Sequence, residues 1–178
     1  MEFRLAQPQE TETVIEFYRK AIEDMAGLPY MPKWQLGVNP TEAGLGGAIS
    51  RGELYLVERD GAPVGAVILN HECDSAYKRV EWGIEAEPGQ VTVLHTLCVT
   101  PKEQRKGIGG FLIQNVLRRA RELGQKTVRL DVLGTSLPPQ KMYRSAGFAH
   151  RATLTLCYED TGPADFLLFE YVLDTPGL

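Results

Sequence analysis

The sequence predicts an α/β fold with a mixed sheet, and three features of its residue pattern predict it. Two short runs, 54–57 and 64–69, are apolar and strand-like, and they flank Asp60-Gly61, a dipeptide typical of hairpin turns. A longer apolar, β-branched run, Val91 to Val99, leads through a glycine-rich turn into a segment with helical spacing. Strand-like runs return near the C-terminus, at 127–133, 153–158 and 166–173.

Apolar residues at helical spacing indicate where the helices lie. One such pattern runs from about residue 8 to residue 26 and stops before Gly27, a plausible helix terminator. Another begins at Gly107, places its apolar residues on one face and ends at Gly124. Two shorter helices are expected at 42–50 and 138–145. Irregular connections are expected at 28–41, which is rich in proline and aromatic residues, and at the polar stretch 72–90.

The size and composition of the chain exclude several classes of protein. Its 178 residues fit one domain, residues 1–178, which can bury a core without disulfides or metals. A net charge of −4 argues against general nucleic-acid binding. No apolar run is long enough to span a bilayer, and the N-terminus lacks the pattern of a secretory signal. We therefore expect a cytoplasmic monomer or homodimer with no nucleic-acid or membrane partner.

The cysteines and acidic residues give no sign of a metal centre. Cys73, Cys98 and Cys157 are far apart and form no CxxC pair, so a zinc site or a redox dithiol has no support. Single cysteines in strand-like runs are usually small core residues in a reducing compartment. We expect no metal.

The segment from Gln104 to Gly110, Gln-Arg-Lys-Gly-Ile-Gly-Gly, is the most informative part of the chain. Its glycines permit positive φ angles and leave backbone N–H groups uncovered, and the helix that follows adds unpaired N–H donors and a positive dipole end. Lys102, Arg105 and Lys106 add positive charge. The segment therefore predicts a site for a phosphate or pyrophosphate. The alternative is a glycine-rich turn with solvated basic residues.

Two common nucleotide-binding loops do not match this segment. A dinucleotide fingerprint needs a third glycine where Leu112 stands. A P-loop ends in Gly-Lys-Ser/Thr, whereas here the lysine precedes the glycines and Phe111 follows them.

Two remaining patterns resemble signatures of the GCN5-related N-acetyltransferases (GNAT), which bind acetyl-coenzyme A. Gln-x-x-Gly-x-Gly after a strand ending at Val99 resembles the family's pyrophosphate loop. The segment from Pro138 to Phe148 resembles its second signature, a short helix that carries a tyrosine and closes with Gly-Phe. The resemblance covers roughly residues 53–173. It implies a mixed, mostly antiparallel central sheet flanked by helices, with two adjacent strands splayed apart to admit the pantetheine arm.

The resemblance also implies which residues bind the cofactor. They lie on the end of one strand, on the glycine loop and near the second signature: Leu97, Cys98, Val99, Gln104, Arg105, Lys106, Gly107, Ile108, Gly109, Gly110, Ser136 and Tyr143. One position departs from the family, which often has asparagine where this chain has Ser136. We expect cofactor binding to survive this change.

Two residues are candidates for acid and base catalysis of amine acetylation. Tyr143 stands where the family places its general acid, and a phenol pKa near ~10 lies above that of a thiol, ~8.5, so the proton can pass to the thiolate. His95, on the strand that leads into the loop, is the candidate base because imidazole titrates near neutrality. By strand alternation His95 shares a face with Leu97 and Val99. Either residue could instead be purely structural.

The acceptor site is less well defined by the sequence. Tyr30 and Trp34 are candidates for its wall, and Glu81 and Trp82 are candidates for binding a cationic amine. Glu81 and Glu85 are rival bases. The leading hypothesis is an acetyl-coenzyme A-dependent N-acetyltransferase acting on a small primary amine. The alternatives are acetylation of a protein N-terminus or lysine, and a non-catalytic acyl-coenzyme A-binding domain.

Overall fold

The computed structural model describes residues 1–30 and 32–174 and has an open sheet as its centre. Its strands are β1 (Glu2–Leu5), β2 (Leu54–Arg59), β3 (Ala62–Asn70), β4 (Val91–Val99), β5 (Thr127–Leu133), β6 (Ala149–Tyr158) and β7 (Gly162–Val172). They lie side by side in the order β1-β2-β3-β4-β5-β7-β6. Every neighbouring pair is antiparallel except β4 and β5, which are parallel. The predicted mixed, mostly antiparallel sheet is confirmed.

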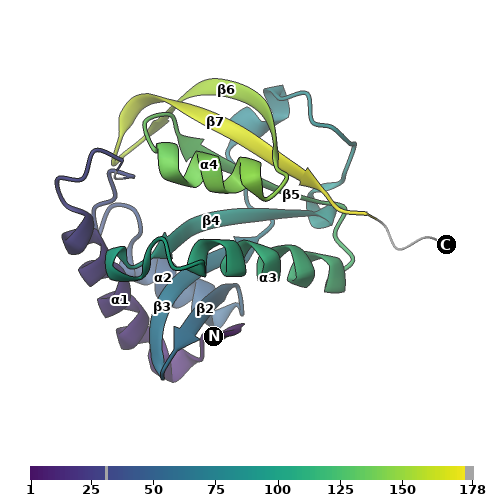
Figure 1. The fold of residues 1–178 in the computed structure, drawn as a ribbon. Coiled ribbons are helices and arrows are strands. Elements are labelled where there is room, and N and C mark those ends of the chain that lie inside the picture. The colour runs from purple at the N-terminus through teal and green to yellow at the C-terminus, as the bar shows by residue number, and fades with distance from the viewer. Residues whose placement is uncertain (31, 175–178) are drawn as a thin grey trace.

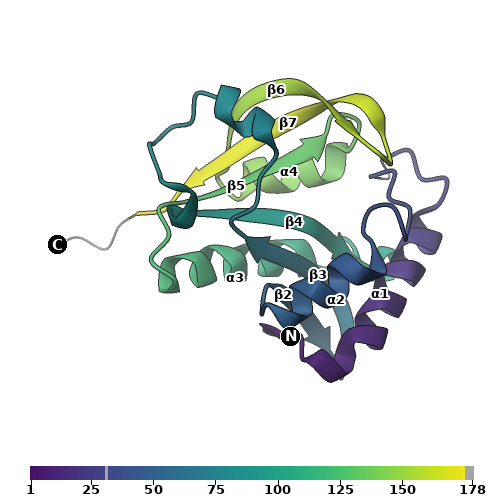
Figure 2. The ribbon, with the colours of Figure 1, turned by 180° about the vertical axis from the view of Figure 1, so that it is seen from behind.

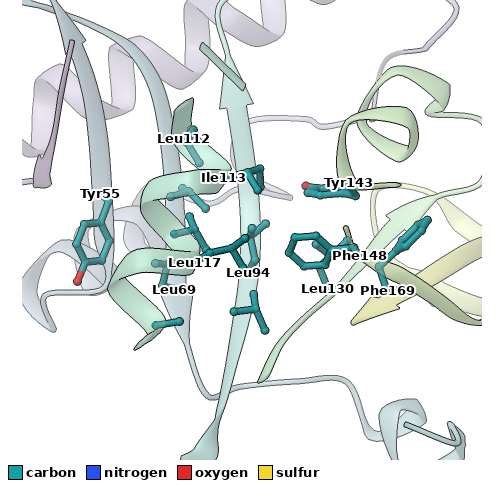
Figure 3. Close-up of a cluster of buried hydrophobic side chains, with 14 of the residues drawn as sticks. Tyr55, Leu69, Leu94, Leu112, Ile113, Leu117, Leu130, Tyr143, Phe148 and Phe169 are labelled. Carbon is teal, nitrogen blue, oxygen red and sulfur yellow. The ribbon is translucent and has the colours of Figure 1, made fainter. Parts of the chain in front are cut away.

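Helices cover both faces of this sheet (Figure 1). The α-helices are α1 (Thr11–Met25), α2 (Glu42–Ser50), α3 (Ile108–Glu122) and α4 (Leu137–Ser145). The first two pack on one face around a cluster that includes Tyr18, Leu45 and Leu56. The other two pack on the opposite face, where Leu112 and Ile113 of α3 and Tyr143 of α4 meet the strands (Figure 3).

Short 3-10 helices complete the connections. They are Pro8–Glu10 before α1, Ser75–Arg79 and Pro88–Gln90 between β3 and β4, and Pro101–Glu103 after β4. The segment between β3 and β4 was expected to be an irregular connection. Its Tyr77 and Val80 pack against Val93 and Leu168. It extends the α1–α2 layer over the second half of the sheet (Figure 2).

Most expected boundaries agree with the structure, and one turn does not. Asp60 and Gly61 have φ angles of 54° and 76°, which is the left-handed pair that a type I′ hairpin turn requires. The connection expected at 160–165 is shorter, because β7 already begins at Gly162 and Cys157 pairs with Pro163. In the aromatic stretch 28–41, residue 31 lies outside the described residues.

Candidate active site

The two central parallel strands separate to form a cavity. Pairing of β4 with β5 is limited to three positions, from Val91 opposite Thr127 to Val93 opposite Arg129. Both strands then continue without pairing to each other, β4 to Val99 and β5 to Leu133. A cavity of about 810 Å³ lies along this gap and is lined by residues of both strand ends. The splayed pair implied by the resemblance is therefore present.

A bulge in β4 changes which side chains face which layer. Ile68 of β3 lies opposite His95, but Ala66 lies opposite Cys98, so β4 has one extra residue between these two pairs. The bulge lies at Thr96, whose φ angle is 47°. His95 therefore shares a face with Cys98, since their partners both belong to the α1–α2 cluster. Simple alternation, which grouped His95 with Leu97 and Val99, was wrong.

The glycine loop closes one end of the cavity. Arg105 and Gly107 adopt positive φ angles, 63° and 83°, and turn the chain into α3. The N–H of Phe111 donates to the carbonyl of Gly107, so the preceding N–H groups have no partner within the helix. Arg105 and Gly109 line the cavity. The Gln104 amide donates to the carbonyl of Val99 at 3.2 Å and so fastens the loop to the end of β4.

Other predicted cofactor residues contribute in different ways. The ammonium of Lys106 pairs with Glu103 at 3.1 Å on the surface. Ile108 is buried in the α3 core. The Cys98 thiol is buried against α1 and α2, and burial raises its pKa to about 12. Any contact that Ile108 or Cys98 makes with a cofactor is therefore a contact of its backbone.

Ser136 fits a hydrogen-bonding ligand. This residue precedes α4, is only 2% exposed and lines the cavity. Its Oγ has no hydrogen-bond partner among the described residues. Because buried polar atoms are normally paired, the hydroxyl is available to a polar group of the cofactor, in place of the asparagine amide common in the family.

Tyr143 presents a protonated phenol to the same cavity. Its ring packs between Phe148 and Phe169, with centroids 5.6 and 6.1 Å away. The hydroxyl points towards β4 (Figure 3). Burial, and secondarily the charge of Asp131, raises the pKa of this phenol. The group is therefore a proton donor at neutral pH.

His95 is held as one tautomer of a neutral imidazole. Its Nε2 lies 3.0 Å from the carbonyl oxygen of Glu72 and 2.9 Å from Oδ1 of Asn70. That Oδ1 also accepts from the N–H of Glu72, so both neighbours of Nε2 are acceptors. Nε2 therefore carries the hydrogen, and Nδ1 keeps its lone pair. Burial lowers the pKa of His95, which favours the neutral form.

The far end of the cavity contains residues that the sequence did not indicate. Tyr30 and Trp34 line it, and so do Asp131, Tyr158 and Asp160. Tyr77 donates its hydroxyl hydrogen to Oδ1 of Asp131 at 2.7 Å. Burial raises the pKa of this aspartate. In the sequence, the role of Asp131 was indicated only by a charged residue within the strand 127–133. An ordinary solvent-facing strand position shows the same pattern.

The candidate acceptor residues of the polar stretch lie elsewhere. Glu81, Trp82 and Glu85 border a separate hollow rather than the main cavity. A buried charge network lies beneath these residues and holds their segment in this place. Glu170 accepts hydrogen bonds from Arg129 at 3.1 Å and from the N–H of Gly83 at 2.6 Å. Arg129 also stacks on the Trp82 ring at 4.3 Å. The structure therefore does not bring these residues to the main cavity.

The part of the chain that the structure describes shows no candidate metal centre and no membrane helix. Within residues 1–30 and 32–174, no group of three or more His, Cys, Asp or Glu side chains could hold a metal ion. None of the helices described is long and apolar enough to cross a membrane.

Comparison with known proteins establishes the family. The model of the acetyltransferase (GNAT) family matches residues 15–148, so the chain belongs to this family. It is an acyltransferase that uses acetyl-coenzyme A. No curated protein matches the sequence at a significant level.

Solved structures share the whole fold at low sequence identity. The protein yncA of Salmonella typhimurium, solved with its cofactor acetyl-CoA, superposes with a TM-score of 0.71 at 16% identity, covering 100% of this chain and 96% of its own. A ribosomal-protein-alanine N-acetyltransferase from Brucella melitensis gives 0.69 at 18% identity, with 97% and 100% covered. A structure assigned as a phosphinothricin N-acetyltransferase gives 0.68 at 19%, with 97% and 98% covered. These likenesses concern the fold and leave the acceptor open.

Proposed function

We propose that this enzyme transfers the acetyl group of acetyl-coenzyme A directly to a primary amine of a small molecule. The observation that carries the proposal is that one cavity joins the glycine loop, Tyr143 and His95 along the unpaired ends of β4 and β5. In this proposal its residues would serve as the anion site, the proton donor and the proton acceptor that amine acetylation needs.

The chain would hold the cofactor with the groups described above. The N–H groups at the start of α3 and the Arg105 side chain would bind the pyrophosphate. The unpaired edge of β4 near Leu97 to Val99 and the Ser136 hydroxyl would bind the amides of the arm. Acetyl-coenzyme A supplies the acetyl thioester for the reaction.

Two side chains would move protons during the transfer. His95 Nδ1 accepts a proton from the amine, directly or through water, as the new C–N bond forms. Tyr143 donates its phenolic proton to the sulfur as the C–S bond breaks, and the proton held by His95 returns to Tyr143 through solvent. A backbone N–H of β4 near the bulge would stabilise the oxyanion between these steps.

A contact across the acceptor end favours a small molecule over a protein acceptor. The Asn39 side-chain amide donates to Oδ2 of Asp160 at 3.0 Å. It thereby ties the loop between α1 and α2 to the turn between β6 and β7, which lie close together in both views (Figures 1 and 2). A polypeptide acceptor needs an open groove at this place.

The direct test is an acceptor screen with acetyl-coenzyme A that follows release of the free thiol. We expect turnover with small primary amines. Preferential turnover of peptides with free N-termini or lysines would replace the proposed acceptor. Tight coenzyme A binding without turnover of any amine would indicate a binding domain.

A further inference from the structure

The acceptor end of the cavity is acidic. The carboxylate residues that line the cavity are Glu72, Asp74, Asp131, Glu159 and Asp160. Arg105 is the only arginine or lysine among the lining residues described, and it belongs to the glycine loop at the other end. A neutral amine, which is the form that reacts, gains little from so many carboxylates. Their presence points to a cationic group that stays charged during the reaction.

One of these carboxylates has an unfilled hydrogen-bonding position. Oδ2 of Asp160 accepts from Asn39, but Oδ1 is buried and accepts from none of the described residues. A buried carboxylate oxygen without a donor is costly, so a ligand donor at this place would be stabilising.

A second carboxylate is fixed in position towards the same space. Tyr77 donates to Oδ1 of Asp131, and Asp131 and His95 both line the cavity. The rings of Tyr30, Trp34 and Tyr158 also line the cavity. Aromatic faces attract ammonium groups and suit the methylene chain that carries them.

We propose that the acceptor is a small aliphatic molecule with at least two amino groups. One amine reacts beside His95, and another, as an ammonium ion, binds Asp160 and Asp131. This inference rests on the proposed function and deepens it by naming the substrate class. The second ammonium gains charge-assisted hydrogen bonds, and it orients the reacting amine.

The test compares acceptors that differ only in the distal group: diaminobutane with an amine at each end, aminobutanol and butylamine. We expect kcat/KM for the diamine to exceed that for aminobutanol by about 10- to 100-fold, the range for a hydrogen bond to a charged group. Asp160→Asn should remove about tenfold of this preference by lowering kcat/KM for the diamine more than for aminobutanol. Asp131→Asn, which retains an acceptor for Tyr77, should do the same. Unchanged coenzyme A affinity by calorimetry shows that each variant is folded.

Glu12→Gln is the matched control, because it removes one exposed carboxylate of α1 that does not line the cavity. It should leave the ratio of diamine to aminobutanol unchanged. Equal kcat/KM for the three acceptors, equal losses for all of them in the aspartate variants, or a lysine peptide better than the diamine would overturn the inference and keep the acetyltransferase reaction. No thiol release with any amine would overturn the proposed function as well.

Discussion

The Tyr18 hydroxyl donates a hydrogen bond to the carbonyl oxygen of Thr96 at 2.8 Å. Tyr18 lies on α1 and is fully buried, and Thr96 is the bulged residue of β4 with a φ angle of 47°. The bond therefore connects α1 to the β4 bulge, and this bulge determines which faces of the sheet His95 and Leu97 occupy. A bulge removes a carbonyl from regular strand pairing, and the tyrosine supplies the missing donor.

Tyr18→Phe should therefore destabilise the fold and disturb the cofactor site together. Loss of the donor leaves a carbonyl without its partner, at a cost of about 1–3 kcal/mol in the free energy of unfolding. We also expect weaker coenzyme A binding, because the β4 edge lies next to the bulge. Denaturant unfolding and calorimetry measure the two effects. Tyr55→Phe is the control, since its hydroxyl contacts Arg119 rather than β4. Wild-type stability in the Tyr18 variant would contradict this role.

The fold was predictable where the local pattern and the tertiary contacts agree. Val91–Val99 and Thr127–Leu133 have the predicted bounds, and Asp60-Gly61 forms the predicted hairpin turn. The bulge was not predictable, because Thr96 is a β-branched residue in a run that reads as an uninterrupted strand. Its carbonyl accepts a hydrogen bond from Tyr18, which is far away in the sequence.

The site was predictable only in part, for a similar reason. The glycine loop and Tyr143 lie in contiguous motifs, and both line the cavity as expected. The acidic acceptor end brings together residues of separate loops and of β5, a combination that only the folded chain creates. Trp82 lies outside the main cavity and stacks on Arg129, which pairs with Glu170 only when β5 pairs with β7.

Gly107→Ala should lower coenzyme A affinity as well as the stability of the fold. At a φ angle of 83° an alanine is strained by about 1–2 kcal/mol. Shifting the loop to relieve that strain moves the N–H groups of α3 away from the pyrophosphate. We expect coenzyme A to bind at least about tenfold more weakly, which equals ~1.4 kcal/mol. Calorimetry with the folded variant gives the value.

Gly124→Ala is a matched control for this substitution. Gly124 follows the other end of α3 with a φ angle of 67°, and an added Cβ meets no atom within 4 Å at either glycine. The two variants should lose similar stability, but only Gly107→Ala should lose coenzyme A affinity. Equal affinities in both would place the pyrophosphate elsewhere.

If Tyr143 is the proposed general acid, Tyr143→Phe should lower kcat by about 10²- to 10⁴-fold, the usual contribution of such a group. Coenzyme A affinity should change little, because the ring keeps its packing against Phe148 and Phe169. Stopped-flow thiol release and calorimetry separate the two quantities. Tyr171→Phe, whose hydroxyl lies near Arg121 and outside the cavity, is the control. Full turnover in the Tyr143 variant at every pH would remove this residue from the mechanism.

The role of His95 is tested by the pH dependence of kcat/KM. A base acts only in its neutral form, so the rate should fall as the pH drops through the pKa of the imidazole. Because burial lowers that pKa, the acidic limb should lie below the ordinary value of ~6.5. His95→Gln keeps a hydrogen-bonding group but no base in this range. It should lower kcat/KM at neutral pH and remove the limb, with a smaller loss at high pH, where more acceptor is already neutral.

The substrate amine also titrates, so the comparison of variant with wild type uses one acceptor throughout. His150→Gln is the matched control, because it makes the same change in an exposed residue of β6 that does not line the cavity. Its profile should coincide with that of the wild type. If the profile of His95→Gln also coincided with it, His95 would serve only to fasten β4 to Glu72 through its Nε2 hydrogen bond. Asp131, which borders the same region of the cavity, would then be the next candidate for the base.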